Sequence, residues 1–184
     1  EYRNNASLIL HATFNCDGIE SRAFIMGDAD WDYLEKVYQK TYQRGRTNRL
    51  DWNLFYISHH CSYKALSDVK GDKETIPKPD VKKLLEHGQA DSYMVASCKS
   101  IENNSDAYNQ EQPPHIQAKN CYEKILDSVN GRKMIITMEN NNKITPRPVS
   151  FKFNYAGCTL MTILASSTSV AESSPSRAGG VNGI

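Results

Sequence analysis

Short apolar runs recur along the chain, and each has the length of a single buried β-strand. The most apolar runs cover residues 7–14, 54–58, 134–138 and 158–165. None approaches the roughly 20 apolar residues that a membrane-spanning helix needs. After the first run, Asp17-Gly18 predicts a hairpin turn into a return strand.

Helical spacing of apolar residues follows this predicted hairpin. Residues 31–42 carry apolar side chains close to a 3.6-residue period, which predicts a helix with Asp30 as its N-cap. In chain order, the predicted elements are strands 7–14 and 21–26, helix 31–42, strand 54–58, helix 80–86, strand 92–97, helix 115–129, and strands 133–138, 149–153 and 159–164. This alternation predicts one layered α/β domain over residues 1–165. Residues 100–114 are expected to form a long loop. Ser, Gly, Ala and Pro dominate after residue 165, which predicts a flexible tail over 166–184.

Composition and charge give no support to several classes of protein. The chain has 22 basic and 21 acidic residues, so its net charge of +1 gives no argument for binding nucleic acid or a membrane surface. Arg44, Arg46 and Arg49 form a basic cluster, which is expected on a solvated loop, with phosphate contact as the alternative. The five cysteines are widely spaced and include no CxxC pair, and no secretion signal is seen. We therefore expect a cytoplasmic protein with reduced thiols and no membrane partner.

Two predicted strands end on side chains that can bind a metal ion. Gly27-Asp28 follows the strand over 21–26, and His59-His60 follows the strand over 54–58. Strand ends are common positions for chemistry in α/β proteins, and Gly27 would let another group approach closely. Carboxylate and imidazole groups suit zinc, manganese or iron. Taken alone, Gly27-Asp28 also fits a turn or helix start, and the histidines also fit a surface loop.

Three segments in this order resemble the metallo-β-lactamase superfamily, especially its branch in competence-type DNA-uptake proteins. Residues 2–10 are similar to that branch's N-x-S-L-V-L strand, residues 24–30 to its L-L-T-G-D strand end, and residues 55–62 to its H-H-G-S loop. Pro113-Pro114-His115 resembles a later H-P element in reversed order. The resemblance covers about residues 2–125. It implies the C-terminal half of an αββα metallo-β-lactamase sandwich.

The resemblance also implies a dinuclear metal site, often of zinc, with manganese or iron as alternatives. It makes Asp28 the carboxylate that bridges the two metals and one of His59 and His60 the last histidine ligand. His59 is preferred because it directly follows the strand, and His60 would then support the site or contact substrate. A metal-bound hydroxide would attack an ester, an amide or a phosphodiester.

The sequence also departs from the family pattern. The first motif, H-x-H-x-D-H, is absent, and Cys61 replaces the glycine of H-H-G-S. His11 is expected to be a strand residue rather than the missing ligand. The chain thus offers two or three ligands, whereas a catalytic zinc uses three protein ligands and a water. The abrupt start at Glu1 fits a fragment, so we expect the N-terminal half, upstream or on a separate chain, or a second copy to complete the domain.

Two hypotheses of different classes follow. In the first, the chain is part of a metal-dependent hydrolase, acting on phosphodiesters with nucleic acid as a candidate partner, and active only when the missing motif is supplied. In the second, it is a non-catalytic half-domain that serves assembly or binding. Three local alternatives are weaker: a Cys61 thiol nucleophile, an acidic cation loop at Asp28, Asp30 and Asp32, and a substrate contact by His115.

Overall fold

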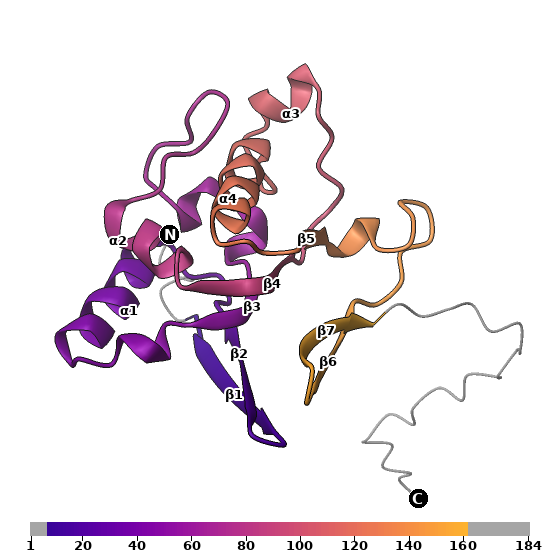
Figure 1. The fold of residues 1–184 in the computed structure, drawn as a ribbon. Coiled ribbons are helices and arrows are strands. Elements are labelled where there is room, and N and C mark those ends of the chain that lie inside the picture. The colour runs from indigo at the N-terminus through magenta and orange to yellow at the C-terminus, as the bar shows by residue number, and fades with distance from the viewer. Residues whose placement is uncertain (1–6, 162–184) are drawn as a thin grey trace, which may run out of the picture.

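A five-stranded mixed sheet forms the centre of the fold in the computed structural model, which describes residues 7–161. The strands follow the order β1 (Leu10–Cys16), β2 (Ile19–Ile25), β3 (Trp52–Tyr56), β4 (Gly88–Ala96) and β5 (Lys133–Ile136). β1 pairs antiparallel with β2, and β2 to β5 run parallel. The predicted α/β class is therefore confirmed (Figure 1).

The β1–β2 hairpin forms at the predicted turn. Asp17 and Gly18 both have positive φ, at 53° and 83°, as a two-residue hairpin turn requires. β1 starts at Leu10 rather than at residue 7 because the residues before it lie against the loop after β2. There, the Asp28 N–H donates to the Ser7 hydroxyl at 2.8 Å.

Three helices cover one face of the sheet: α1 (Trp31–Gln43), α2 (Pro79–Leu85) and α4 (Ile116–Ser128). Their apolar faces bury side chains against Trp52, Phe55 and Met94 of the sheet. Each large apolar side chain buried in this way contributes about 1.5–3 kcal/mol. Figure 1 shows this helical layer on one side of the strands.

The long loop predicted over residues 100–114 contains one further helix, α3 (Ser105–Asn109). The Asn104 side chain caps it by accepting a hydrogen bond from the Ala107 N–H at 2.9 Å. The polar composition of this segment gives no apolar period, so the helix was not predicted.

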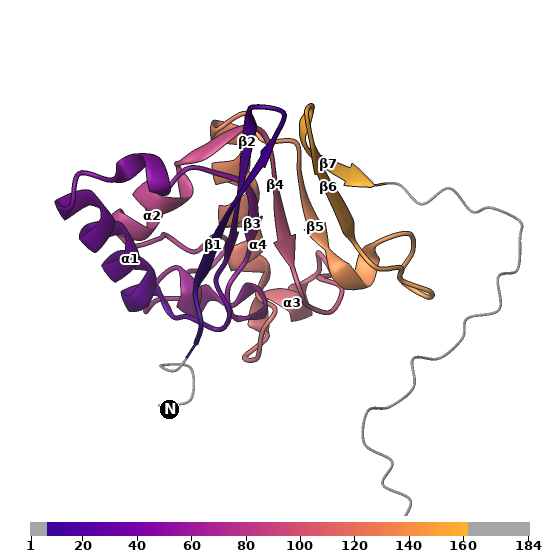
Figure 2. The ribbon, with the colours of Figure 1, turned by 90° about the horizontal axis from the view of Figure 1, so that it is seen from below.

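The last two strands form a hairpin of their own. β6 (Ser150–Asn154) and β7 (Gly157–Met161) lie close to the strands predicted over 149–153 and 159–164, and they pair antiparallel in a two-stranded sheet separate from the main one. Phe151 packs on Tyr93 of β4, with ring centroids 5.3 Å apart, on the face opposite the helices. Figures 1 and 2 show the hairpin beside β5.

Within residues 7–161, no helix is both long and apolar enough to cross a membrane. The five cysteines all lie in this range and carry free thiols. The tail predicted over residues 166–184 lies outside the described residues.

Candidate functional site

The candidate residues meet at one edge of the sheet, where parallel strands β2, β3 and β4 end. Ile25, Tyr56 and Val95 are register neighbours near these ends. Asp28 follows β2, His60 follows β3, and Ser97 directly follows β4. Parallel pairing thus brings together three segments that are far apart in sequence.

Asp28 and His60 form the pair closest to a metal-binding arrangement. Asp28 Oδ1 lies 3.6 Å from His60 Nε2, and both side chains are about half exposed. His60 Nδ1 lies 2.7 Å from the Ser97 carbonyl oxygen, so the Nδ1–H donates to that oxygen. This bond fixes the tautomer with a lone pair on Nε2, on the side of Asp28.

The spacing of this pair fits two ligands of one ion. A separation of 3.6 Å is too long for a direct hydrogen bond. Two ligands that each lie about 2.0–2.1 Å from a tetrahedral zinc ion are roughly 3.3–3.4 Å apart. Only a small adjustment would therefore place one divalent ion between Asp28 and His60.

His59 has a different carboxylate partner, Asp30. Its Nδ1 lies 3.0 Å from Asp30 Oδ1, and both side chains are less exposed than the Asp28–His60 pair. Asp30 occupies the N-cap position of α1, but its side chain makes no capping hydrogen bond. The predicted N-cap position of Asp30 is thus confirmed, but its carboxylate bonds to His59 instead of capping the helix.

The backbone of the His59-His60 loop is left-handed. His59, His60 and Cys61 have φ values of 50°, 51° and 63°. For residues other than glycine this conformation costs roughly 1–2 kcal/mol each. Backbone strain of this kind persists only where surrounding contacts impose it, and it is concentrated at functional sites.

Several hydrogen bonds hold the strained loop in place. The His59 N–H donates to the Gly27 carbonyl at 3.0 Å, which ties the loop after β3 to the loop after β2. The buried Ser58 hydroxyl lies within hydrogen-bond distance of the Gly27 and Ala29 carbonyl oxygens. The His115 N–H donates to the Cys61 carbonyl at 3.0 Å. The backbone that carries the candidate histidines is therefore held by hydrogen bonds to the loop after β2 and to α4.

Gly27 permits the close approach that the sequence predicted. Its φ is +54°, and a Cβ added there would lie 3.0 Å from the Leu8 carbonyl oxygen and 3.3 Å from Ser7 Oγ. The residues before β1 thus pack directly against the turn that positions Asp28.

Cys61 belongs to the core rather than to the candidate site. Its side chain is fully buried among apolar residues. Burial raises the pKa of the Cys61 thiol well above its ordinary value, and burial raises that of Cys98 to about 12. Both thiols are therefore neutral near pH 7, which argues against a nucleophilic Cys61.

His115 is a buried residue that contacts the His59-His60 loop. It is 1% exposed and is the N-cap residue of α4, so the alternative of a substrate contact is wrong. Its Nδ1 lies 3.4 Å from the Tyr63 N, and its Nε2 lies 3.2 Å from the Glu111 carbonyl oxygen. The Nε2–H therefore donates to Glu111, and Nδ1 accepts from Tyr63. A structural role for His115 at the start of this helix was the favoured interpretation of the sequence, and its burial supports that interpretation, whereas its bonds to Tyr63 and Glu111 could not be predicted.

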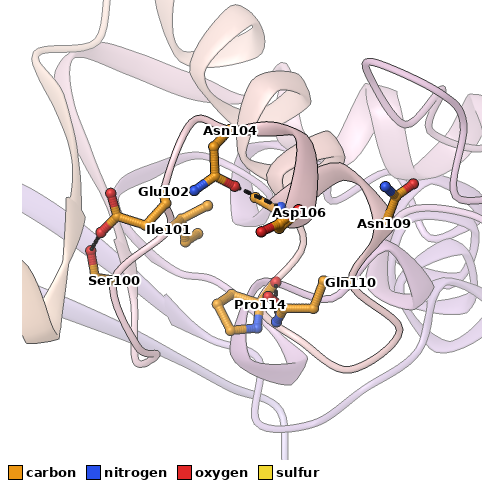
Figure 3. Close-up of a pocket in the computed structure, with 9 residues that line it drawn as sticks. Ser100, Ile101, Glu102, Asn104, Asp106, Asn109, Gln110 and Pro114 are labelled. Atoms are coloured by element: carbon orange, nitrogen blue, oxygen red, sulfur yellow. Dashed lines mark hydrogen bonds between the residues drawn. The ribbon is translucent and has the colours of Figure 1, made fainter.

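A pocket of about 420 Å³ opens in the segment that follows β4 and begins with Ser97. Figure 3 shows the carboxylates and amides around it, and its lining includes Glu102, Asn104, Asp106 and Gln110. Lys143 Nζ lies 2.7 Å from Glu102 Oε1 and balances one of the two carboxylates. The lining suits a polar ligand, and the sequence, read as a loop, gave no signal for it.

The other histidines serve structural bonds. His11 lies in β1, as predicted, with Nε2 3.2 Å from the Asp51 carbonyl oxygen, and His87 Nδ1 lies 3.1 Å from Asp51 Oδ1. Across residues 7–161, no group of three or more His, Cys, Asp or Glu side chains is placed to hold a metal ion. The described residues therefore provide paired ligands, but not a complete site.

Comparison with known proteins gives this chain no relative. No family model matches it, and neither a curated protein nor a solved structure does. The geometry at the sheet edge and the resemblance of the three motifs are thus the grounds for a functional argument.

Proposed function

We propose that the chain forms the C-terminal half of a metallo-β-lactamase-type αββα sandwich and carries one wall of a metal-dependent hydrolase site. The observation that carries the proposal is the Asp28–His60 pair, with 3.6 Å between Oδ1 and Nε2 and with His60 anchored on the Ser97 carbonyl. Metal-binding histidines commonly donate their second N–H to an oxygen in this way.

The second face of the sheet supports the sandwich part of the proposal. Leu10 and Ile25 are register partners on β1 and β2, and they are 46% and 41% exposed. The β6–β7 hairpin packs on the part of this face formed by Tyr93, Val95 and Ile135. A further sheet packed on Leu10 and Ile25 would bury apolar surface that is otherwise exposed to water.

Asp28 and His60 would hold the ion, and His59 is a further candidate ligand. The Asp30 carboxylate orients the His59 ring, which is the arrangement described for histidine–metal sites. A bound zinc, manganese or iron ion would supply Lewis acidity and lower the pKa of a water molecule. The N-terminal half of the domain, upstream or on a separate chain, or a second copy would provide the remaining ligands of a dinuclear site.

Phosphodiesters are the substrate class that we propose, with nucleic acid as a partner. This part of the proposal rests on the similarity of residues 24–30 and 55–62 to the competence-type branch. The chain combined with a segment that carries H-x-H-x-D-H should accelerate the hydrolysis of bis(4-nitrophenyl) phosphate by a larger factor over the uncatalysed reaction than the hydrolysis of 4-nitrophenyl acetate. The opposite preference would contradict the phosphodiester assignment.

A zinc titration of the full chain tests the site itself. We expect weak binding that Asp28→Asn and His60→Gln each reduce by at least about tenfold. His87→Gln is the matched control, because His87 also lies 3.1 Å from a carboxylate, that of Asp51, but outside the site. Equal zinc affinity in all four proteins would exclude a site at Asp28 and His60. His59→Gln then tells whether His59 is also a ligand.

A second candidate function is a non-catalytic half-domain for assembly or binding. It is favoured by the finding that residues 7–161 hold no group of three metal ligands. Zinc analysis separates the two functions. If the complex with the complementary half retains no stoichiometric metal, the assembly function stands and the hydrolase proposal fails.

A further inference from the structure

We propose that a second pocket, at the C-terminal end of α1, binds a nucleotide-class ligand by its phosphate group. The pocket has a volume of about 390 Å³ and lies between β1, β2, α1 and the loop of residues 44–49. This volume falls within the range of roughly 300–1,000 Å³ that is usual for small-molecule sites.

Three arginines form the rim of this pocket: Arg44, Arg46 and Arg49. All three are exposed. Within residues 7–161, their guanidinium groups make no hydrogen bond or ion pair, whereas Arg22 is bound to both Glu20 and Asp51. Guanidinium groups bind phosphate through paired N–H donors, so unpaired arginines around one hollow suit an anionic ligand.

The neighbouring carboxylate does not neutralise this rim. Asp51 Oδ2 lies 3.1 Å from Arg22 Nη1, and Asp51 Oδ1 lies 3.1 Å from His87 Nδ1. Both carboxylate oxygens of Asp51 therefore already have partners. The positive charge at the rim remains available to a ligand from solution.

The floor of the pocket is apolar and partly aromatic. Ile9, Phe24 and Val37 line it, together with His11, whose ring centroid lies 4.3 Å from that of Phe24. The Nε2–H of His11 donates to the Asp51 carbonyl, so its Nδ1 remains an acceptor. A flat ring that carries an N–H or O–H donor would match this floor. A ligand that combines such a ring with a phosphate for the arginines is a nucleotide, which suits the pocket better than inorganic phosphate does.

The three arginines of this pocket lie at the opposite end of α1 from the candidate metal site. Asp28 lies just before α1, whereas the arginines follow its last residue, Gln43. A helix of 13 residues at 1.5 Å per residue spans about 20 Å. Figure 2 shows α1 running along the side of the sheet between these ends. The nucleotide proposal uses none of the residues on which the metal proposal rests.

Calorimetric titration of the full chain in EDTA tests the pocket without contribution from a metal ion. We expect adenosine 5′-monophosphate to bind more tightly than inorganic phosphate, and adenosine to bind more weakly than the monophosphate. The triple variant Arg44→Gln, Arg46→Gln and Arg49→Gln should lose at least tenfold in affinity for the monophosphate. Val37→Glu should also weaken it by crowding the floor.

A matched triple variant controls for net charge. Lys73→Gln, Lys99→Gln and Lys152→Gln remove the same charge from exposed positions outside the pocket. The control should bind the monophosphate as the wild type does. Equal losses in the two triple variants, or no binding to the wild type, would overturn the proposal. Equal affinity for inorganic phosphate and the monophosphate would overturn the nucleotide assignment.

Discussion

Gly27 and the residues His59, His60 and Cys61 put left-handed backbone on both sides of the candidate site. In the loop after β2 this conformation falls on a glycine, where it is permitted. In the loop after β3 it falls on side chains that pay a steric cost. The β3 loop is therefore the strained half of the site, and Gly27 is a position where an added side chain has little room.

Replacement of Gly27 by alanine should lower the free energy of unfolding by about 2–3 kcal/mol. The new Cβ would hold a positive φ and would meet the Leu8 carbonyl oxygen at 3.0 Å. Gly18→Ala is the control, because its φ is +83° and no atom lies within 4 Å of the added Cβ. It should lose only about 1–2 kcal/mol in urea denaturation. Equal losses of unfolding free energy in the two variants would show that close packing at Gly27 does not contribute to stability.

Residues with strong local signals were predictable from sequence, and those defined by tertiary contacts were not. Asp17-Gly18 forms the expected turn because its backbone preference is local. The bond between Asp30 and His59 spans 29 positions and joins the ends of different strands. The sequence pattern around a helix start cannot show that His59 competes with the helix backbone for the Asp30 carboxylate.

At the scale of elements, α4 and the loop after β3 act as a unit. His115, at the N-terminus of α4, donates its backbone N–H to Cys61 and accepts the Tyr63 N–H on its ring. Desolvation by burial is the largest cause of its lowered pKa, and the charges of Lys70 and Lys64 act in the same direction. The ring is therefore neutral in the folded protein near pH 7.

The stability of the protein should decrease as pH falls below about 6.5, the ordinary pKa of histidine. Below that pH the unfolded chain binds a proton at His115 that the folded protein does not bind, until pH falls through the lowered folded-state pKa. His115→Gln should flatten this dependence in urea denaturation between pH 5 and 8. His11 keeps part of it, because its pKa is also lowered, mainly by burial. An unchanged slope in His115→Gln would contradict this role of His115.

The order of the elements was predictable from periodicity, but their partners were not. Helices α1, α2 and α4 lie within a few residues of their predicted bounds because their apolar faces repeat at helical spacing. The alternation of apolar and polar residues in β6 and β7 is equally visible in the sequence. A two-residue period, however, does not indicate which strand lies next to them. Phe14 stacks on Phe153 at 4.0 Å, a contact between strands almost 140 positions apart. Contacts of that range place the β6–β7 hairpin against β1.

At the scale of the whole molecule, the two faces of the sheet differ. The helices bury one face completely at residues such as Phe55 and Met94. On the other face the β6–β7 hairpin leaves Leu10 and Ile25 exposed on adjacent strands. Exposed apolar side chains on neighbouring strands mark a surface suited to a further layer.

We therefore expect the isolated chain to associate with a second copy of itself through this face. Sedimentation velocity should show an average mass that rises with protein concentration, since burial of apolar surface drives such association. The double variant Leu10→Ser and Ile25→Ser should stay monomeric at the same concentrations. Val69→Ser with Ile144→Ser is the control, because those side chains are 66% and 92% exposed in loops, and neither residue lies on β1 or β2.

If the proposed function is right, a complementary half of the domain should compete with this self-association. Its addition should replace the homodimer by a one-to-one complex, and Leu10→Ser with Ile25→Ser should weaken that complex as well. If the wild-type chain stays monomeric at all concentrations and binds no complementary half, the exposed face has no docking role. The metal site would then lack a source for its remaining ligands, because the described residues supply only the pairs of Asp28 with His60 and Asp30 with His59.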